Sequence, residues 1–165
     1  MSEGIDPDSG ELSADALRQL RTARVVSLGM ISGVLIFAGI LFVLQQGKLI
    51  DELGLMSIAG LGGSAVAVIM SWVVPPLFAP TFSVGSDAAE SPVESVAQIW
   101  FMQTVMTMAI LELAALANLT SVMLEHSQYS LAAAGVPAVV MMLRFPTASR
   151  LRTWLQLRQQ NSGAV

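Results

Sequence analysis

Long apolar stretches, separated by short polar ones, dominate the pattern of residues along the chain. Four such stretches lie at about 25–46, 55–78, 98–123 and 128–145. Uncharged gaps of 23, 34 and 17 residues hold the first, the second and most of the fourth, and the third contains one charge, Glu112. Crossing the ~30 Å hydrocarbon core of a bilayer takes about 20 mostly apolar residues. The pattern therefore predicts four membrane spans.

These spans are expected to be α-helices. Backbone groups in lipid have no water to bind, and the stretches lack the alternation of barrel strands. The predicted fold class is all-α: an integral membrane four-helix bundle over residues 13–146. The last span is the weakest, with six Leu, Val or Phe residues and with Gly135 and Pro137 inside it. We expect it to insert as a hairpin with the third span.

Basic residues set the expected orientation, because seven of the eight flank the two ends of the chain. They are Arg18, Arg21, Arg24, Arg144, Arg150, Arg152 and Arg158. The positive-inside rule then places both termini in the cytoplasm (N-in/C-in), which agrees with an even number of spans. The predicted location is the bacterial cytoplasmic (inner) membrane, as a multi-pass protein.

Two segments lie outside the predicted spans. Residues 1–12 are polar and acidic, which is typical of a disordered tail, and Ser13 can cap the helix that follows. Residues 147–160 form a basic amphipathic pattern with Arg150, Arg152 and Trp154. We expect an interfacial tail helix there, with its arginines on the phosphates of anionic lipids at the cytoplasmic face. A helix that docks on protein is the alternative.

Composition narrows the function classes. The chain is 54% hydrophobic and only 12% charged, against about 25% charged residues in soluble domains. A net charge of −4 without a basic face argues against nucleic-acid binding. The sequence has no Cys and one His, so we expect no metal and no cofactor. Hydrolase, phosphate-loop and dinucleotide motifs do not occur in it, which predicts that the protein is not an enzyme.

Glu112 is the most informative single residue. An acid in the middle of an apolar span is costly and by default suggests a functional site. We expect a neutral carboxyl that donates a hydrogen bond, with Ser64 or a carbonyl exposed by a glycine as the acceptor. A structural bond between helices, proton or cation handling, and a small wet cavity are the three interpretations of this candidate polar site.

A polar stripe is predicted on the third span, on the face opposite Glu112. Its residues fall within about 60° of one another on a helical wheel. They are Gln103, Thr107, Asn118 and Ser121. Such a stripe should face protein or water, so it either forms hydrogen bonds between helices or lines a pore.

Small residues follow one another at intervals of four on the second span. They are Ala59, Gly63, Ala67 and Ser71. This spacing allows membrane helices to approach closely, within one chain or between copies, so a homo-oligomer or another membrane partner stays open.

The order of these landmarks resembles an uncharacterised family of small bacterial four-helix membrane proteins. The matching features are an Arg-containing start, a Val-Pro end of the second span, a central Glu in the third, and Phe-Pro-Thr before a basic tail. They stand at 17–24, 71–75, 109–115, 144–147 and 150–154. The resemblance implies the fold and no activity.

Residues 110–116 are also similar to the ion-binding helix of the rotor-ring proteolipid of ATP synthases, which implies a proton on Glu112. The prediction is a multi-pass protein with a structural, accessory or interaction role. The alternative is a small transporter or proton-coupled protein that uses Glu112.

Overall fold

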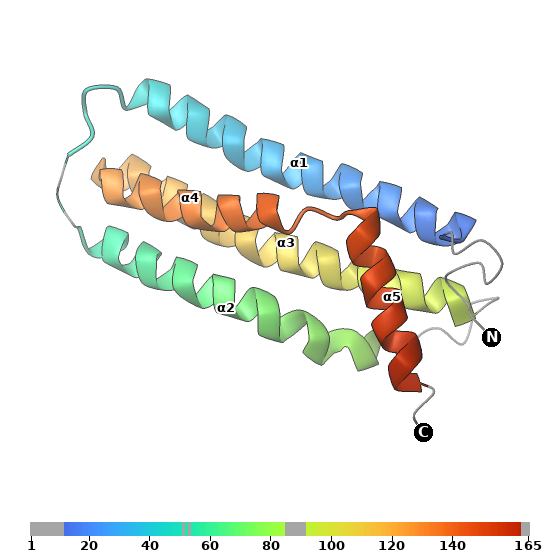
Figure 1. The fold of residues 1–165 in the computed structure, drawn as a ribbon. Helices are drawn as coiled ribbons and strands as arrows, with labels where there is room; N and C mark the ends of the chain where they lie inside the picture. The colour runs from blue at the N-terminus through green and yellow to red at the C-terminus, as the bar shows by residue number, and fades with distance from the viewer. Residues whose placement is uncertain (1–11, 51, 53, 85–91, 163–165) are drawn as a thin grey trace.

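The computed structural model describes residues 12–50, 52, 54–84 and 92–162, and within them the regular structure is helical (Figure 1). The helices are α1 (Ala14–Leu44), α2 (Leu55–Val84), α3 (Pro92–Glu125), α4 (Gln128–Leu143) and α5 (Ala148–Ser162). The all-α prediction is confirmed. Apart from Leu12, the predicted tail 1–12 lies outside the described residues.

Each predicted span coincides with one helix, although the spans 25–46 and 128–145 extend two residues past the ends of α1 and α4, and the four are not equivalent. The helices α1, α2 and α3 are long and apolar enough to cross a membrane. The fourth, α4, has 16 residues, which extend only about 24 Å. It reaches the length of a span only together with α5, and the two are bent by 72° at the break between them.

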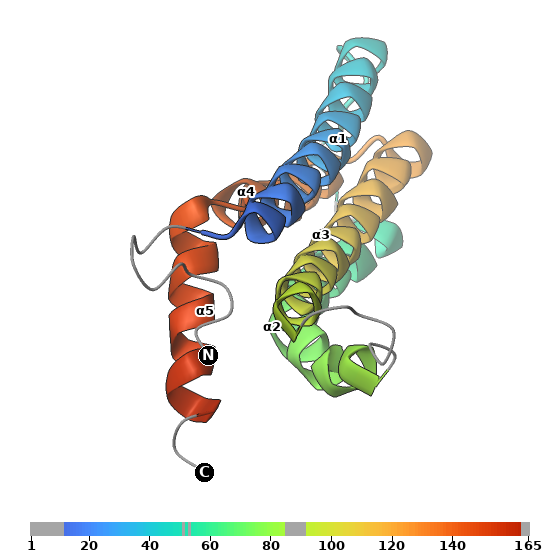
Figure 2. The ribbon, with the colours of Figure 1, turned by 90° about the vertical axis from the view of Figure 1, so that its right-hand side faces the viewer.

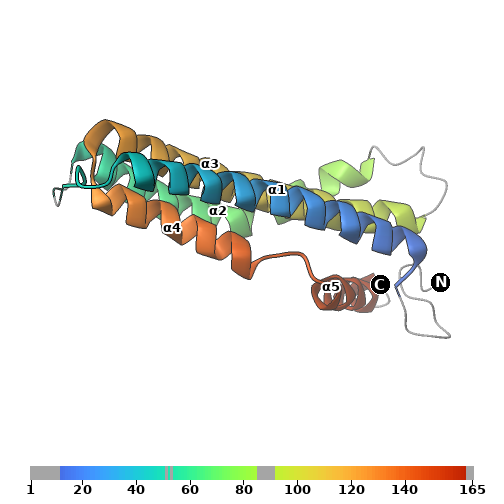
Figure 3. The same cartoon turned by 90° about the horizontal axis from the view of Figure 1, so that it is seen from above.

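Helices α1 to α4 lie side by side, and successive helices run in opposite directions (Figures 1 and 3). Helix α3 contacts α1, α2 and α4, so it forms the centre of the arrangement. In the middle of the molecule its core residues Leu111, Ala115 and Leu119 are fully buried. They pack with side chains of the neighbouring helices.

The expected cap of the first helix is present. The Ser13 hydroxyl accepts a hydrogen bond from the Ala16 amide at 3.3 Å, which satisfies one of the free donors of the first turn. Helix α1 then continues without a break to Leu44. The capped helix and the first span are therefore one element.

Helix α5 packs across the beginning of α1 and α3 (Figure 2). Its apolar residues Leu151 and Leu155 are 0% and 4% exposed, in a cluster with Leu20 and Trp100. An interfacial helix would turn these apolar residues toward lipid, but here they are buried inside the protein. This apolar face fits the alternative, a helix that docks on protein, because it packs on α1 and α3 of the same chain.

Two connections meet at the opposite end of the helices. The Ile50 amide donates to the His126 carbonyl at 2.9 Å, and the Gln128 amide donates to the Ile50 carbonyl. The Ser127 hydroxyl donates to the Glu52 carbonyl at 2.8 Å. The link between α1 and α2 is thereby tied to the turn between α3 and α4.

Candidate functional site

Glu112 lies on the side of α3 that faces α1. It is half-buried, and a Cβ atom added to Gly33 would lie 3.9 Å from its Oε1 atom. Within the described part of the chain, the Glu112 carboxyl forms no hydrogen bond. The absence of a side chain at Gly33 leaves room for the acid between the two helices.

The expected bond between Glu112 and Ser64 is wrong. The Ser64 hydroxyl donates to the Ala133 carbonyl of α4 at 3.2 Å and accepts from the Asn118 amide at 2.8 Å. Ser64 is therefore used on the side of α3 away from Glu112, and the two members of the candidate polar site are separated.

A proline explains why Ser64 bonds to Ala133. Pro137 has no N–H, so the carbonyl four residues earlier in α4 loses its helix donor. That carbonyl belongs to Ala133, and the Ser64 hydroxyl replaces the missing donor. One buried serine thus joins α2, α3 and α4.

Asn118 fits against α2 because residue 60 is glycine. A Cβ atom on Gly60 would overlap the Asn118 Oδ1 atom. The Nδ2 atom of Asn118 donates to Ser64 and also to the Ala114 carbonyl of its own helix, at 2.7 Å. Its buried Oδ1 atom has no hydrogen-bond donor among the described residues.

The rest of the polar stripe points mainly to α2. Gln103 donates to the Pro75 carbonyl at 3.4 Å, and Thr107 donates to the Ser71 carbonyl at 3.4 Å. Ser121 differs, since its hydroxyl donates to Ala117 of its own helix. Gln103 and Asn118 therefore bond between helices, whereas the single Thr107 hydroxyl hydrogen is shared with the nearer Gln103 carbonyl of its own helix, at 2.8 Å.

A second proline exposes the Ser71 carbonyl. Pro75 removes the helix donor that this carbonyl would otherwise have, four residues later. The Arg144 Nη1 atom, at the end of α4, donates to it at 2.9 Å. The last turns of α2 change direction beyond this point (Figure 2).

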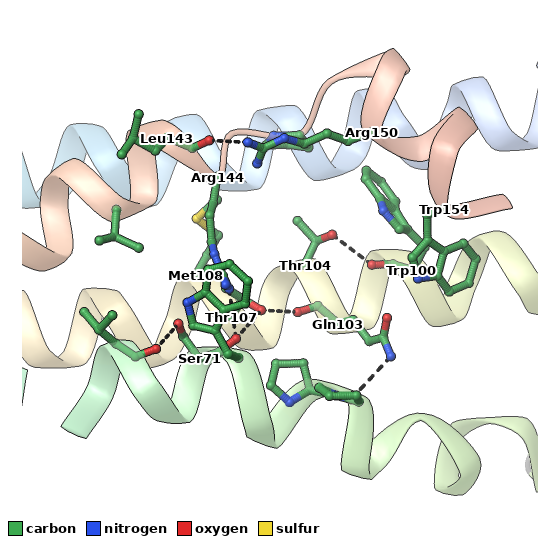
Figure 4. A pocket seen from close by; sticks show the side chains of 16 residues that line it. Ser71, Trp100, Gln103, Thr104, Thr107, Met108, Leu143, Arg144, Arg150 and Trp154 are labelled. Carbon is green, nitrogen blue, oxygen red and sulfur yellow. Dashed lines mark hydrogen bonds between the residues drawn. The ribbon is translucent and has the colours of Figure 1, made fainter. Parts of the chain in front are cut away.

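A pocket of about 600 Å³ lies where α2, α3, α4 and α5 meet (Figure 4). Its polar lining combines the stripe residues Gln103 and Thr107 with Arg144 and Arg150. Its apolar and aromatic lining includes Val68, Met108, Val140, Trp72, Trp100 and Trp154. The pocket thus joins the predicted polar stripe to the predicted tail.

Hydrogen bonds to backbone carbonyls hold both pocket arginines in place. Arg144 donates to Ser71, and its guanidinium lies 3.9 Å from the ring centroid of Trp72, a cation–π contact. The Arg150 Nη2 atom donates to the Leu143 carbonyl at 2.6 Å. Arg152, the other predicted tail arginine, is exposed and does not line the pocket.

At the other end of α2, a carboxylate caps the helix. The Glu125 oxygens accept from the Met56 amide at 2.8 Å, the Ser57 amide at 2.9 Å and the Ser57 hydroxyl at 2.7 Å. Glu125 ends α3, past the apolar stretch 98–123. The Ser57 side chain, then the Met56 amide, lower the pKa of this carboxyl below its ordinary 4.5. An anion at a helix N-terminus is favourable because it accepts the free amides.

Comparisons with known proteins assign no family or function to the chain. No family model matches the chain, and neither curated proteins nor solved structures include a match. Among the described residues, no group of three or more His, Asp or Glu side chains could hold a metal ion.

Sequence reasoning missed the roles of Arg144 and Glu125. Arg144 is predicted from the sequence only as a charge that sets orientation, and no role is predicted for Glu125. A usable signal for Arg144 was present, because any proline inside a helix exposes a carbonyl four residues earlier. No comparable signal marked Glu125, whose partners lie 68 and 69 positions away.

Proposed function

We propose that this chain is a multi-pass protein of the bacterial inner membrane, with four spans packed as a bundle and both termini on the cytoplasmic side. In this proposal its role is structural, accessory or interaction-based, and it is not enzymatic. The resemblance to the family of small four-helix membrane proteins fits this proposal.

The hydrogen bonds of the polar stripe favour a structural role over a pore. Thr107 and Asn118 spend their donors on α2 or on their own helix, and Gln103 spends one of its two amide hydrogens on α2. A pore lining needs polar groups that remain free for water or solute. Residues already bonded between helices instead hold the spans together.

The clustering of basic residues supports the proposed orientation. The Arg24 Nε atom donates to the Pro146 carbonyl at 3.2 Å, so the basic start of α1 lies beside the link between α4 and α5. All three tryptophans line the pocket at this same end. Tryptophan belts mark either membrane interface, and the clustered arginines are typical of the cytoplasmic one.

Cysteine labelling tests the orientation directly, because the natural chain has no Cys. Gln46→Cys and Ser149→Cys place single thiols at exposed positions at opposite ends of the helices. A membrane-impermeant maleimide should label Gln46→Cys in intact cells and Ser149→Cys only after the membrane is opened. Labelling of Ser149→Cys in intact cells would refute the proposed orientation.

One observation favours proton coupling as a second candidate function. Glu112 is half-buried beside Gly33 and has no hydrogen-bond partner among the described residues. In this alternative, Glu112→Gln abolishes proton flux into liposomes while the protein still folds. In the structural role, the same substitution leaves both folding and proton permeability unchanged.

A further inference from the structure

We propose that the pocket between α2, α3, α4 and α5 binds the phosphate headgroup of an anionic phospholipid. Arg144 and Arg150 hold the headgroup, and the apolar floor holds the beginning of the acyl chains. This inference rests on the proposed placement of the chain in a membrane, and it adds a defined binding site to it.

The charge of the pocket is unbalanced. Two guanidinium groups line it, whereas no carboxylate does so among the described residues. The described lining of the pocket therefore holds two positive charges and no carboxylate to balance them. Phosphate is a fitting counterion, because guanidinium groups bind it with strong, charge-assisted hydrogen bonds.

Both arginines retain donors after their contacts within the chain. A guanidinium carries five N–H groups, and the pocket bonds of Arg144 and Arg150 go to one carbonyl each, Ser71 and Leu143. Those bonds and the stacking of Arg144 on Trp72 fix the two groups before a ligand arrives. Less side-chain freedom is then lost on binding, which favours affinity.

The remaining lining favours an amphiphile over a fully polar anion. Val68, Met108 and Val140 form an apolar part beside the arginines. The rings of Trp72 and Trp154 are amphipathic and suit the headgroup level of a bilayer. A volume of about 600 Å³ suits a headgroup with the first part of its chains. A soluble phosphate monoester would use the arginines and leave the apolar part uncovered.

Tryptophan fluorescence provides a direct readout, because the three tryptophans of the chain all line the pocket. The full chain is placed in phosphatidylcholine nanodiscs that contain a small fraction of brominated phosphatidylglycerol or brominated phosphatidylcholine. Bromine on the acyl chains quenches nearby indoles. We expect the anionic lipid to quench at a several-fold lower fraction than the zwitterionic one. Equal quenching by both lipids would overturn the proposal.

Arg150→Gln tests the role of the guanidinium. It should lower the preference for the anionic lipid several-fold, because the neutral amide loses the charge-assisted hydrogen bonds to the phosphate. Arg152→Gln is the matched control on the same helix, and it should change the preference less than twofold. Equal losses in both variants would mean general surface charge and would overturn the site. Arg150→Lys should restore part of the preference.

Arg144→Gln completes the series, but it also removes the donor to the Ser71 carbonyl and can impair folding. Arg150→Gln keeps the proposal falsifiable in that case. Added glycerol phosphate should not relieve quenching by the brominated anionic lipid. If it did, the site would serve a soluble phosphate and the lipid proposal would fail. Cysteine labelling tests orientation separately, so the pocket and the proposed function can fail independently.

Discussion

Helices α2 and α3 meet in two halves that differ in charge: a pocket of about 450 Å³ without charged residues in its described lining borders the close half, around Gly60 and Asn118, and a pocket with two arginines borders the open half. In the close half, Gly60 receives Asn118, and the Glu125 carboxylate caps the start of α2. In the open half, Gln103 and Thr107 reach α2 only through long bonds of 3.4 Å. The pocket of about 600 Å³ lies beside them.

The two halves differ in how their polar groups are satisfied. In the close half, three donors from the start of α2 bind the Glu125 carboxylate. The arginines of the open half keep most of their donors, and no carboxylate lines their pocket. The two halves therefore differ in what they can bind, because the pocket beside the close half has no charged residue in its described lining, whereas that of the open half holds two arginines.

The largest effect is expected from Gly60→Ala, which attacks the close half. The new Cβ atom would overlap the Asn118 Oδ1 atom, so the helices must separate or Asn118 must move. Forcing extra atoms into a packed contact costs about 1–3 kcal/mol of stability. Thermal unfolding in detergent, followed by circular dichroism, measures the loss.

Gly63→Ala is the matched control, because it is the same substitution three positions further along the same helix. Nothing lies within 4 Å of a Cβ atom at Gly63, so its effect on stability should be near zero. Equal destabilisation by both substitutions would show that helix backbone effects, and not the close approach to Asn118, account for the loss.

The sequence predicted the helices well and their facing sides poorly. Long uncharged gaps require helices of a certain length, and each predicted span ends no more than two residues outside one helix. The rotation of each helix about its axis is a tertiary property. Glu112 and Asn118 lie about 120° apart on α3, and nothing in the sequence says which of them faces Ser64. In the structure it is Asn118 that donates a hydrogen bond to Ser64.

The pocket was only half predictable for the same reason. The stripe residues Gln103 and Thr107 and the tail residues Arg150 and Trp154 were each expected from their local pattern. Their meeting depends on the 72° bend between α4 and α5, which brings the tail back onto α1 and α3. A pattern along one helix carries no information about such a bend.

A moderate effect is expected from Ser64→Ala. The substitution leaves the Ala133 carbonyl without its donor and removes the acceptor of the Asn118 amide. Polar contacts between membrane helices contribute about 0.6–1.7 kcal/mol, so a loss in this range should appear in detergent unfolding. Ser121→Ala removes a hydroxyl that bonds only within α3 and should be nearly neutral.

A double-mutant cycle with Pro137→Ala shows whether the proline causes this dependence. Alanine at 137 supplies the N–H that the Ala133 carbonyl lacks, so Ser64→Ala should cost less in that background. Additive losses in the double variant would mean that the Ser64 hydroxyl does not compensate for Pro137.

The smallest change in stability is expected when acid protonates the Glu125 carboxylate that caps α2. The pKa of this carboxyl is lower in the folded chain than its ordinary 4.5, mainly because the Ser57 hydroxyl donates to it. A depressed pKa gives stability that is complete above 4.5 and is lost as the pH falls through the folded pKa. At pH values below 4.5, the unfolding temperature of the natural chain should therefore decrease more steeply than that of Glu125→Gln.

Glu52→Gln is the control at the same end, because Glu52 is exposed, and it should keep the full pH dependence. Identical pH profiles of the natural chain and Glu125→Gln would mean that the carboxylate does not stabilise the close half.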